Sequence, residues 1–169
     1  MHVLDSNFDA MHKYLPEVLQ VLYQVFTTAK NSLMKKYAYQ SLYELFKILM
    51  TYKQKDQFRD TIVEFTKSVW EDVIKNLREP KDIINDEDPE VERAVKLVKY
   101  LMRFLRDGFI PFLESLFTTV FEAYRKHPIC SYVYVLEVSI TVFYDDATLT
   151  DYFRTLYQSF CQITYAHLK

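Results

Sequence analysis

Glycine is almost missing from this chain of 169 residues and occurs once, at Gly108. Sandwiches, barrels and nucleotide-binding α/β folds need glycines for tight turns and phosphate loops. The chain cannot supply them, so the sequence predicts an all-α protein. The β-branched run at residues 132–142 has strand-like propensity and leaves a buried strand as an alternative. We predict helix there because Pro128 suits a first helical turn and no strand partner is visible elsewhere.

Cysteine is scarce as well. Cys130 and Cys161 lie in apolar helical stretches and do not form a disulfide framework, so we expect reduced, buried thiols in a cytosolic or nuclear protein. No apolar run is long enough to cross a membrane and the N-terminus has no signal-peptide pattern, so we expect no membrane insertion. The formal net charge of −2 argues against a generally basic nucleic-acid binder, though not against a local basic patch.

Motifs that carry catalysis are also missing. The four histidines are scattered, and none has a second ligand at metal-binding spacing. There is no phosphate-binding loop, no G-x-S-x-G and no H-E-x-x-H. The acidic residues at 86–88 and 145–146 lack the spacing of a calcium loop. We therefore expect no enzyme, no catalytic residue, no metal site and no cofactor.

Helical periodicity, in contrast, runs along most of the chain. We predict about seven helices, at residues 7–28, from 31 or 32 onward, and at 56–77, 91–106, 110–126, 128–143 and from 148 onward. Pro16 either bends the first helix or splits off a leading turn. Asp107-Gly108 ends the fourth as a C-terminal glycine does. The core face of the second helix is expected to hold Leu33, Tyr37, Leu42, Leu45, Phe46 and Leu49.

Long helices joined by short connections predict antiparallel hairpins stacked side by side. Residues 91–169 read as two hairpins of about 35 to 40 residues, the period of HEAT-type repeats. We expect a single HEAT-like α-solenoid segment over residues 1–169, with N-terminal helices at 1–80 and an acidic linker at 81–90. It would be a slice of a larger solenoid; a self-contained helical bundle is the alternative.

The helix at residues 91–106 reads V-E-R-A-V-K-L-V-K-Y-L-M-R-F-L-R and is sharply amphipathic. At about 100° per residue, its basic side chains share a sector of roughly 140°. These are Arg93, Lys96, Lys99, Arg103 and Arg106. Ala94, Val95, Leu97, Val98, Leu101, Met102, Phe104 and Leu105 fill the rest. Asp88-Pro89-Glu90 is a good helix start. The basic stripe is either a binding surface or a solvated face.

From Val91 onward the sequence resembles the C-terminal half of nuclear transport receptors of the importin-beta (karyopherin) superfamily, above all the transportin-SR group. The stretch V-E-R followed by Lys96, Lys99 and Arg103 resembles that family's arginine-rich cargo-binding helix. P-F-L-E-S-L-F-T-T-V-F-E-A-Y and H-P-I-C-S-Y-V-Y-V-L-E-V-S-I-T-V-F-Y resemble the next two helices. Two basic positions are lysine, which lacks the bidentate fork of arginine, and Asp107 is acidic where the family is basic or neutral.

The resemblance implies a non-enzymatic segment of a nuclear transport receptor. Its protein cargo, phosphorylated or acidic and Arg/Ser-rich, would bind at Arg93, Lys96, Lys99, Arg103 and Arg106. Ran-GTP and phenylalanine-glycine (FG) nucleoporins would be partners of the full-length receptor, which shuttles between nucleus and cytoplasm. The acidic residues at 82–92 could compete with cargo for the basic helix.

The residues alone leave a second class of function open, a helical scaffold or adaptor that holds a partner helix in an apolar groove. Exposed aromatic side chains would favour it, for example Tyr132, Tyr134, Tyr152 and Tyr157. RNA binding through the basic helix is the weakest alternative, because the chain is acidic overall and carries no RNA-recognition motif.

Overall fold

The structure, a computed structural model, is all-helical in the part of the chain that it describes: residues 2–52, 55–81, 83 and 87–168, with the side chains of all these except 2–11 and 32. It contains α1 (His2–Thr28), α2 (Ser32–Thr51), α3 (Arg59–Arg78), α4 (Pro89–Leu105), α5 (Ile110–Lys126), α6 (Cys130–Phe143) and α7 (Thr150–His167). Short 3₁₀ turns cover Lys55–Phe58, Arg106–Phe109 and Ala147–Leu149. The predicted all-α helical-repeat fold is confirmed.

The chain forms two compact units that divide within α3, Met1–Ser68 and Val69–Lys169. Each has its own buried apolar core. The expected division into residues 1–80, 81–90 and 91–169 stays a prediction. Among the described helices, none combines the length and the apolar run that crossing a bilayer requires.

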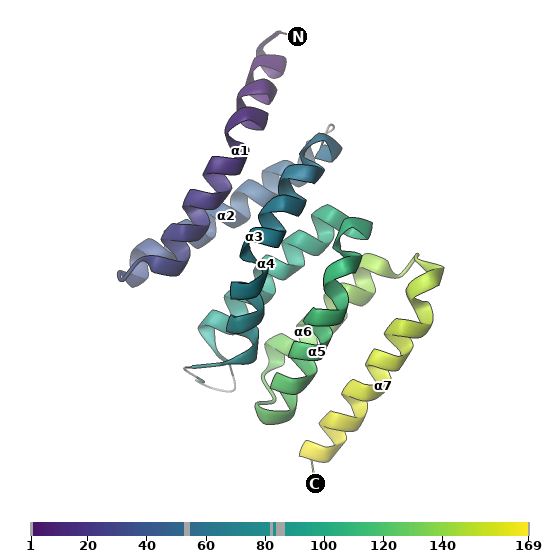
Figure 1. Cartoon of the computed structure of the whole chain (residues 1–169). Helices are drawn as coiled ribbons and strands as arrows, with labels where there is room; N and C mark the ends of the chain where they lie inside the picture. The colour runs from purple at the N-terminus through teal and green to yellow at the C-terminus, as the bar shows by residue number, and fades with distance from the viewer. Residues whose placement is uncertain (1, 53–54, 82, 84–86, 169) are drawn as a thin grey trace. The chain divides into compact units, whose positions relative to one another are not determined.

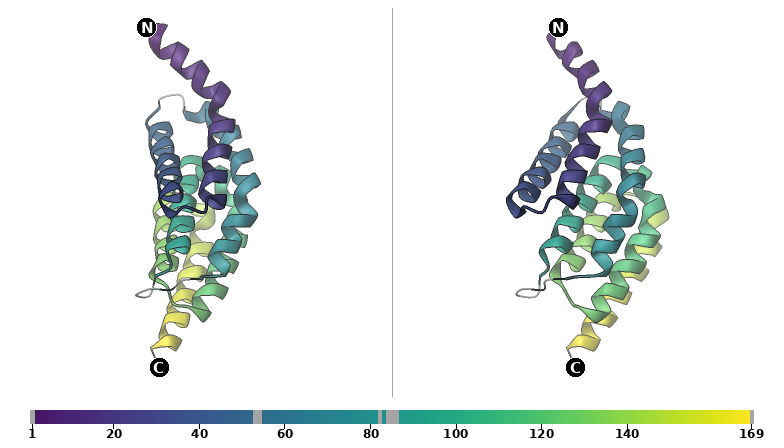
Figure 2. Two further views of the ribbon diagram at one scale, coloured as in Figure 1. Left: turned by 90° about the vertical axis from the view of Figure 1, so that its left-hand side faces the viewer. Right: turned by 60° about the vertical axis from the view of Figure 1, so that its left-hand side comes forward.

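The first unit contains α1, α2 and the first half of α3 (Figure 1). α1 and α2 pack against each other as an antiparallel pair. The rings of Tyr23 and of Phe65 in α3 pack edge to face, with 6.0 Å between centroids. α1 continues through Pro16 as one helix, and its two halves are inclined to each other (Figure 2). A bend follows because proline has no N–H for the carbonyl four residues earlier.

The start of α2 is as predicted, but its core face is rotated. The Asn31 side chain caps the helix by accepting hydrogen bonds from the backbone N–H groups of the next turn. The buried face holds Ala38, Leu42, Tyr43, Phe46 and Leu49. Leu33 and Tyr37, which we expected in the core, are 55% and 59% exposed. At about 100° per residue they lie roughly opposite the centre of the buried face, so the helical period itself separates them from it.

The second unit is a run of helices that reverse direction one after another (Figure 1). α4 packs against α6, and α5 packs against α7. This contact between alternate helices is the pattern of helical-hairpin repeats. The strand alternative at residues 132–142 is wrong, since α6 spans them with Val135, Leu136, Val138 and Val142 in the core.

The junction of α4 and α5 differs from the prediction. α4 ends at Leu105, and the residue with positive φ is Arg106 (φ 47°, ψ −117°). Gly108 lies inside the following 3₁₀ turn, and its φ is not positive. The chain turns early because Phe109, which is fully buried, and Ile110, which opens α5, follow directly.

The predicted burial of both cysteines is wrong, because both thiols are free and exposed. Cys130 is the first residue of α6. On α7 the core positions include Phe160 and Ile163, which turns Cys161 to the solvent side of the helix. An apolar sequence neighbourhood therefore did not predict the side on which each thiol lies.

Tyr132, whose exposure would favour the scaffold alternative, is not exposed. Its side chain is fully buried, and its hydroxyl donates a hydrogen bond of 2.6 Å to the Leu77 carbonyl. Burial, with the nearby carboxylates of Asp88 and Glu87, raises the pKa of Tyr132 well above its ordinary value. Of the other three tyrosines, Tyr134 and Tyr152 are half-buried and Tyr157 is exposed.

Candidate functional site

The start of α4 is built around one buried carboxylate. One Asp88 oxygen accepts hydrogen bonds from the N–H groups of Glu90 (2.8 Å) and Val91 (3.0 Å). The other oxygen accepts a bond of 2.7 Å from the Lys81 N–H. Pro89 occupies the first helical turn. The predicted cap and proline are confirmed, and Asp88 also ties α4 to the chain seven residues earlier.

The apolar side of α4 is buried as predicted. All eight apolar residues expected there are in the core, and Val91 joins them. Because burial of this side fixes the rotation of α4, its charged residues point away from the core. The accessible side of α4 therefore carries Arg93, Lys96 and Lys99, which are half-buried, and Arg103, which is exposed. Arg106 is exposed in the turn that follows α4.

The first two basic residues already have acidic partners on the same helix. Arg93 pairs with Glu90 at 2.7 Å, and the two side chains are 24% and 34% exposed. Lys96 pairs with Glu92. These carboxylates lie three or four residues before their bases, a spacing that brings side chains together on a helix. The spacing was readable from the sequence, although we did not include Glu90 and Glu92 in the site.

Lys99 reaches across to α6. Its ammonium donates a hydrogen bond of 2.6 Å to the Tyr134 hydroxyl and lies 5.2 Å from the centre of that ring. It also lies 5.9 Å from the centre of the Tyr100 ring. The contact couples α4 to α6 across 35 positions of sequence, which is why periodicity within one helix did not reveal Tyr134 as part of the site.

The last two basic residues lie in different settings. Arg103 is exposed and has no ion-pair or hydrogen-bond partner within the described ranges. Arg106 lies in the turn after α4, where its guanidinium reaches the Val142 carbonyl and the Asp145 carboxylate at 3.4 Å. Of the five predicted residues, Arg103 therefore offers its charge most directly to a ligand.

A depression of about 430 Å³ lies beside the basic residues, between α4 and α6. Lys96, Glu92, Glu87 and Tyr134 contribute polar groups to its wall. The Ser131 hydroxyl there donates a hydrogen bond of 2.7 Å to Glu87. Charges of both signs line the depression, so this surface suits a ligand that carries both signs better than a simple anion.

The acidic stretch at 82–92 can be followed only in part. Asp82 and Asp86 lie outside the described residues. Glu87 contacts Ser131 of α6, while Glu90 and Glu92 pair with bases of α4. Competition of the whole stretch with a ligand stays a prediction.

A family model described as the Transportin-3/Importin-13 fourth TPR domain matches residues 60–168. No curated protein and no solved structure matches the chain. The matched range includes α4 and all five predicted site residues. It confirms the likeness to the importin-beta and transportin receptors in the second half of the chain. TPR and HEAT repeats are both helical hairpins, in agreement with the α4–α7 arrangement.

Proposed function

Because this chain belongs to the Transportin-3/Importin-13 family, we propose that it acts as a protein-binding segment of a nuclear transport receptor and catalyses no reaction. The family match over residues 60–168 is the observation that carries this proposal. Movement between nucleus and cytoplasm belongs to the same proposal, as do Ran-GTP and FG nucleoporins as partners of the full-length receptor.

We assign cargo binding to Arg93, Lys96, Lys99, Arg103 and Arg106. Three observations support this assignment. The opposite side of α4 is buried, so these side chains lie at its accessible side. Lys99 is positioned by Tyr134 of the neighbouring helix. Arg103 is exposed and has no partner in the described part of the chain.

The cargo chemistry that fits is an extended, phosphorylated Arg/Ser-rich segment. Its phosphates would bind Arg103 and Lys99, while its arginines would bind Glu90 and Glu92. A purely acidic segment would have to displace these two carboxylates from Arg93 and Lys96 without offering them a new partner. A segment that carries both phosphates and arginines offers each displaced carboxylate and each displaced base a new partner of opposite charge. Each charge-assisted hydrogen bond contributes about 1.5 to 3 kcal/mol when shielded from water, and far less when exposed.

The test is binding of a fluorescent phosphorylated Arg-Ser repeat peptide, followed by anisotropy at about 50 and 200 mM salt. Lys99→Glu/Arg103→Glu is compared with Lys47→Glu/Lys67→Glu, which changes the charge equally at exposed lysines outside α4. We expect the α4 variant to bind at least about tenfold more weakly at low salt, and the control to bind like the parent chain.

Equal weakening of both variants would contradict a site on α4 and indicate general charge attraction. The unphosphorylated peptide serves as a second control. If it binds as tightly as the phosphorylated one, the proposed role of phosphate is wrong.

A helical scaffold that holds a partner helix is the second candidate function. A depression of about 320 Å³ between α6 and α7 supports it, with Ile140, Tyr144 and Tyr157 as exposed apolar lining. Binding to such a surface would depend little on salt. It would survive the α4 charge changes and be lost in Tyr157→Ser.

A further inference from the structure

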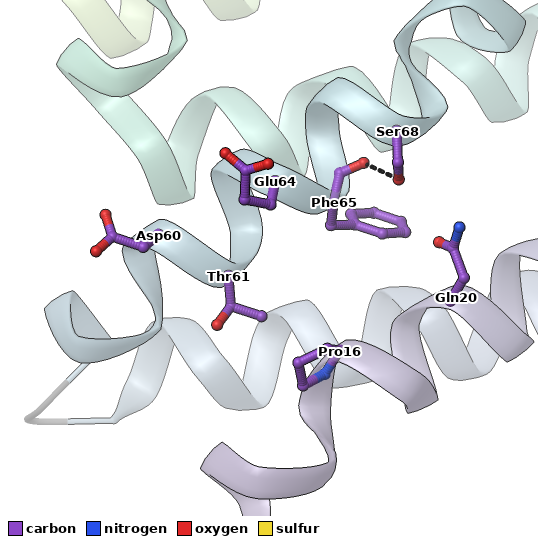
Figure 3. A pocket seen from close by; sticks show the side chains of 7 residues that line it. All are labelled: Pro16, Gln20, Asp60, Thr61, Glu64, Phe65 and Ser68. Atoms are coloured by element: carbon purple, nitrogen blue, oxygen red, sulfur yellow. Dashed lines mark hydrogen bonds between the residues drawn. The ribbon is translucent and has the colours of Figure 1, made fainter.

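The first unit contains an open groove of about 510 Å³ between α1 and α3 (Figure 3). Pro16 and Gln20 line it from α1, and Asp60, Thr61, Glu64 and Phe65 line it from α3. The size lies within the range of about 300 to 1,000 Å³ that is common for ligand pockets. All these lining residues belong to the first unit, whereas α4 belongs to the second.

The floor of the groove is apolar and held in place. Phe65 is only 5% exposed. Its ring packs against Tyr23 at 6.0 Å and Phe46 at 6.3 Å between centroids. The Pro16 ring lies on the opposite wall (Figure 3). An apolar side chain of a ligand could therefore bury area without a prior rearrangement of this floor.

One edge of the groove is acidic. Asp60 and Glu64 lie one helical turn apart on α3, a spacing at which like charges repel each other. Glu64 has Lys67 as a counterion at 2.8 Å, with both side chains more than half exposed. Asp60 has no counterion in the described part of the chain. A cation placed between the two carboxylates would relieve their repulsion.

Two neutral polar groups lie beside this edge. The Thr61 hydroxyl and the Gln20 amide line the groove from opposite walls (Figure 3). Neither has a hydrogen-bond partner among the described residues. An extended peptide backbone, unlike a helix, has free N–H and C=O groups for such side chains.

We propose that this groove binds an extended segment of a partner protein in which an arginine or lysine lies within about three residues of an aromatic side chain. The cation lies between Asp60 and Glu64, and the aromatic ring packs on Phe65 and Pro16. The choice of a cationic occupant follows from charge complementarity, because Asp60 is a groove carboxylate without a counterion in the described part of the chain. This goes beyond the proposed function, which places the cargo contacts on α4.

The probe is the fluorescent peptide Ser-Arg-Arg-Ser-Trp-Ser, titrated with the whole chain. Asp60→Asn/Glu64→Gln removes both carboxylates of the groove. Glu44→Gln/Glu71→Gln is the matched control: it removes the same charge elsewhere, and Glu44 pairs with Lys47 as Glu64 does with Lys67. We expect saturable binding that the groove variant weakens about tenfold or more and the control leaves within about twofold.

Three results would overturn the proposal: no saturable binding, equal weakening by both variants, or equal affinity for a peptide with serine in place of tryptophan. Sedimentation of the chain alone completes the test. Self-association that the groove variant abolishes would mean that the groove holds a second copy of the chain, which also contradicts the proposal. Circular dichroism of both variants checks that each has the helical content of the parent chain.

Discussion

Single residues in the second unit show how polar groups are accommodated in an apolar core. The Tyr132 ring fills the interior, and its hydroxyl satisfies the Leu77 carbonyl near the end of α3. Helix ends leave carbonyl groups without intrahelical partners, and a buried one is costly unless another donor reaches it. Tyr132 is therefore both a packing residue and a cap for another helix.

Removing this hydroxyl should destabilise the chain. In Tyr132→Phe the Leu77 carbonyl loses its donor, and we expect the free energy of unfolding at neutral pH to fall by about 1 to 2 kcal/mol. Urea unfolding followed by circular dichroism measures the difference. Tyr144→Phe is the control, because the Tyr144 side chain is 78% exposed. A loss equally large in Tyr144→Phe would contradict the role of the buried hydroxyl.

The same residue should make stability depend on alkaline pH. Burial raises the pKa of Tyr132 in the folded chain above its unfolded value of about 10. Its contribution is therefore fully present below about pH 10 and is lost as the pH rises further. The stability difference between the parent chain and Tyr132→Phe should shrink above about pH 10. A difference that stays constant to about pH 11 would contradict this linkage.

At the scale of the elements, the turn after α4 holds the one non-glycine residue with positive φ in the described part of the chain. Arg106 has φ 47° and ψ −117°, a region that favours glycine. A non-glycine residue held there costs about 1 to 3 kcal/mol. Its contact with Asp145 is long, at 3.4 Å, and both side chains are more than half exposed, so it offsets little of that cost.

Arg106→Gly should therefore be more stable than Arg106→Ala by about 1 kcal/mol. Both variants lose the guanidinium, so the comparison isolates the backbone. Thermal unfolding of the two variants side by side measures it. Equal stability, or a more stable alanine variant, would mean that the turn imposes no strain at this position.

Elements were predictable wherever a local chemical signal exists. Asn31, Asp88 and Pro111 mark helix starts that the structure reproduces, because capping and proline geometry act over a few residues. Pro128 marks the break before α6, but its predicted place in the first helical turn is wrong because α6 begins at Cys130. The end of α4 was not predictable from Gly108. The buried Phe109 decides where that turn lies, and its burial depends on helices far away in sequence.

The residues of the candidate site also differ in whether local sequence could predict them. The apolar and basic sides of α4 could be predicted from a period of 3.6 residues. Tyr134 and Asp145 could not, because they come from α6 and the turn after it. The exposure of both cysteines and the burial of Tyr132 likewise depend on which side of a helix its neighbours cover.

At the scale of the whole molecule, α3 contributes to both compact units. Phe65 packs in the first unit, and Trp70 packs against Phe109 and Phe112 in the second. The two units divide at residues 68 and 69, inside this helix. Their stabilities are therefore linked through one continuous helical backbone.

Ser68→Pro should weaken both units at once. Proline in a helix interior removes one hydrogen bond and clashes with the preceding turn, which costs about 3 kcal/mol or more. We expect faster amide hydrogen exchange in α2 of the first unit and in α5 of the second. Ser68→Ala is the control and should leave both rates nearly unchanged. Faster exchange confined to one unit would contradict the linkage.

The Asp88 carboxylate also affects how well the chain tolerates inserted residues. It accepts from the Lys81 N–H and caps α4, so it pins both ends of the short connection between them. Closing a longer loop between fixed ends costs only about 0.6 kcal/mol per doubling of its length. We therefore expect that residues inserted between Lys81 and Asp88, such as a tag or a fluorophore-bearing peptide, leave the start of α4 unchanged.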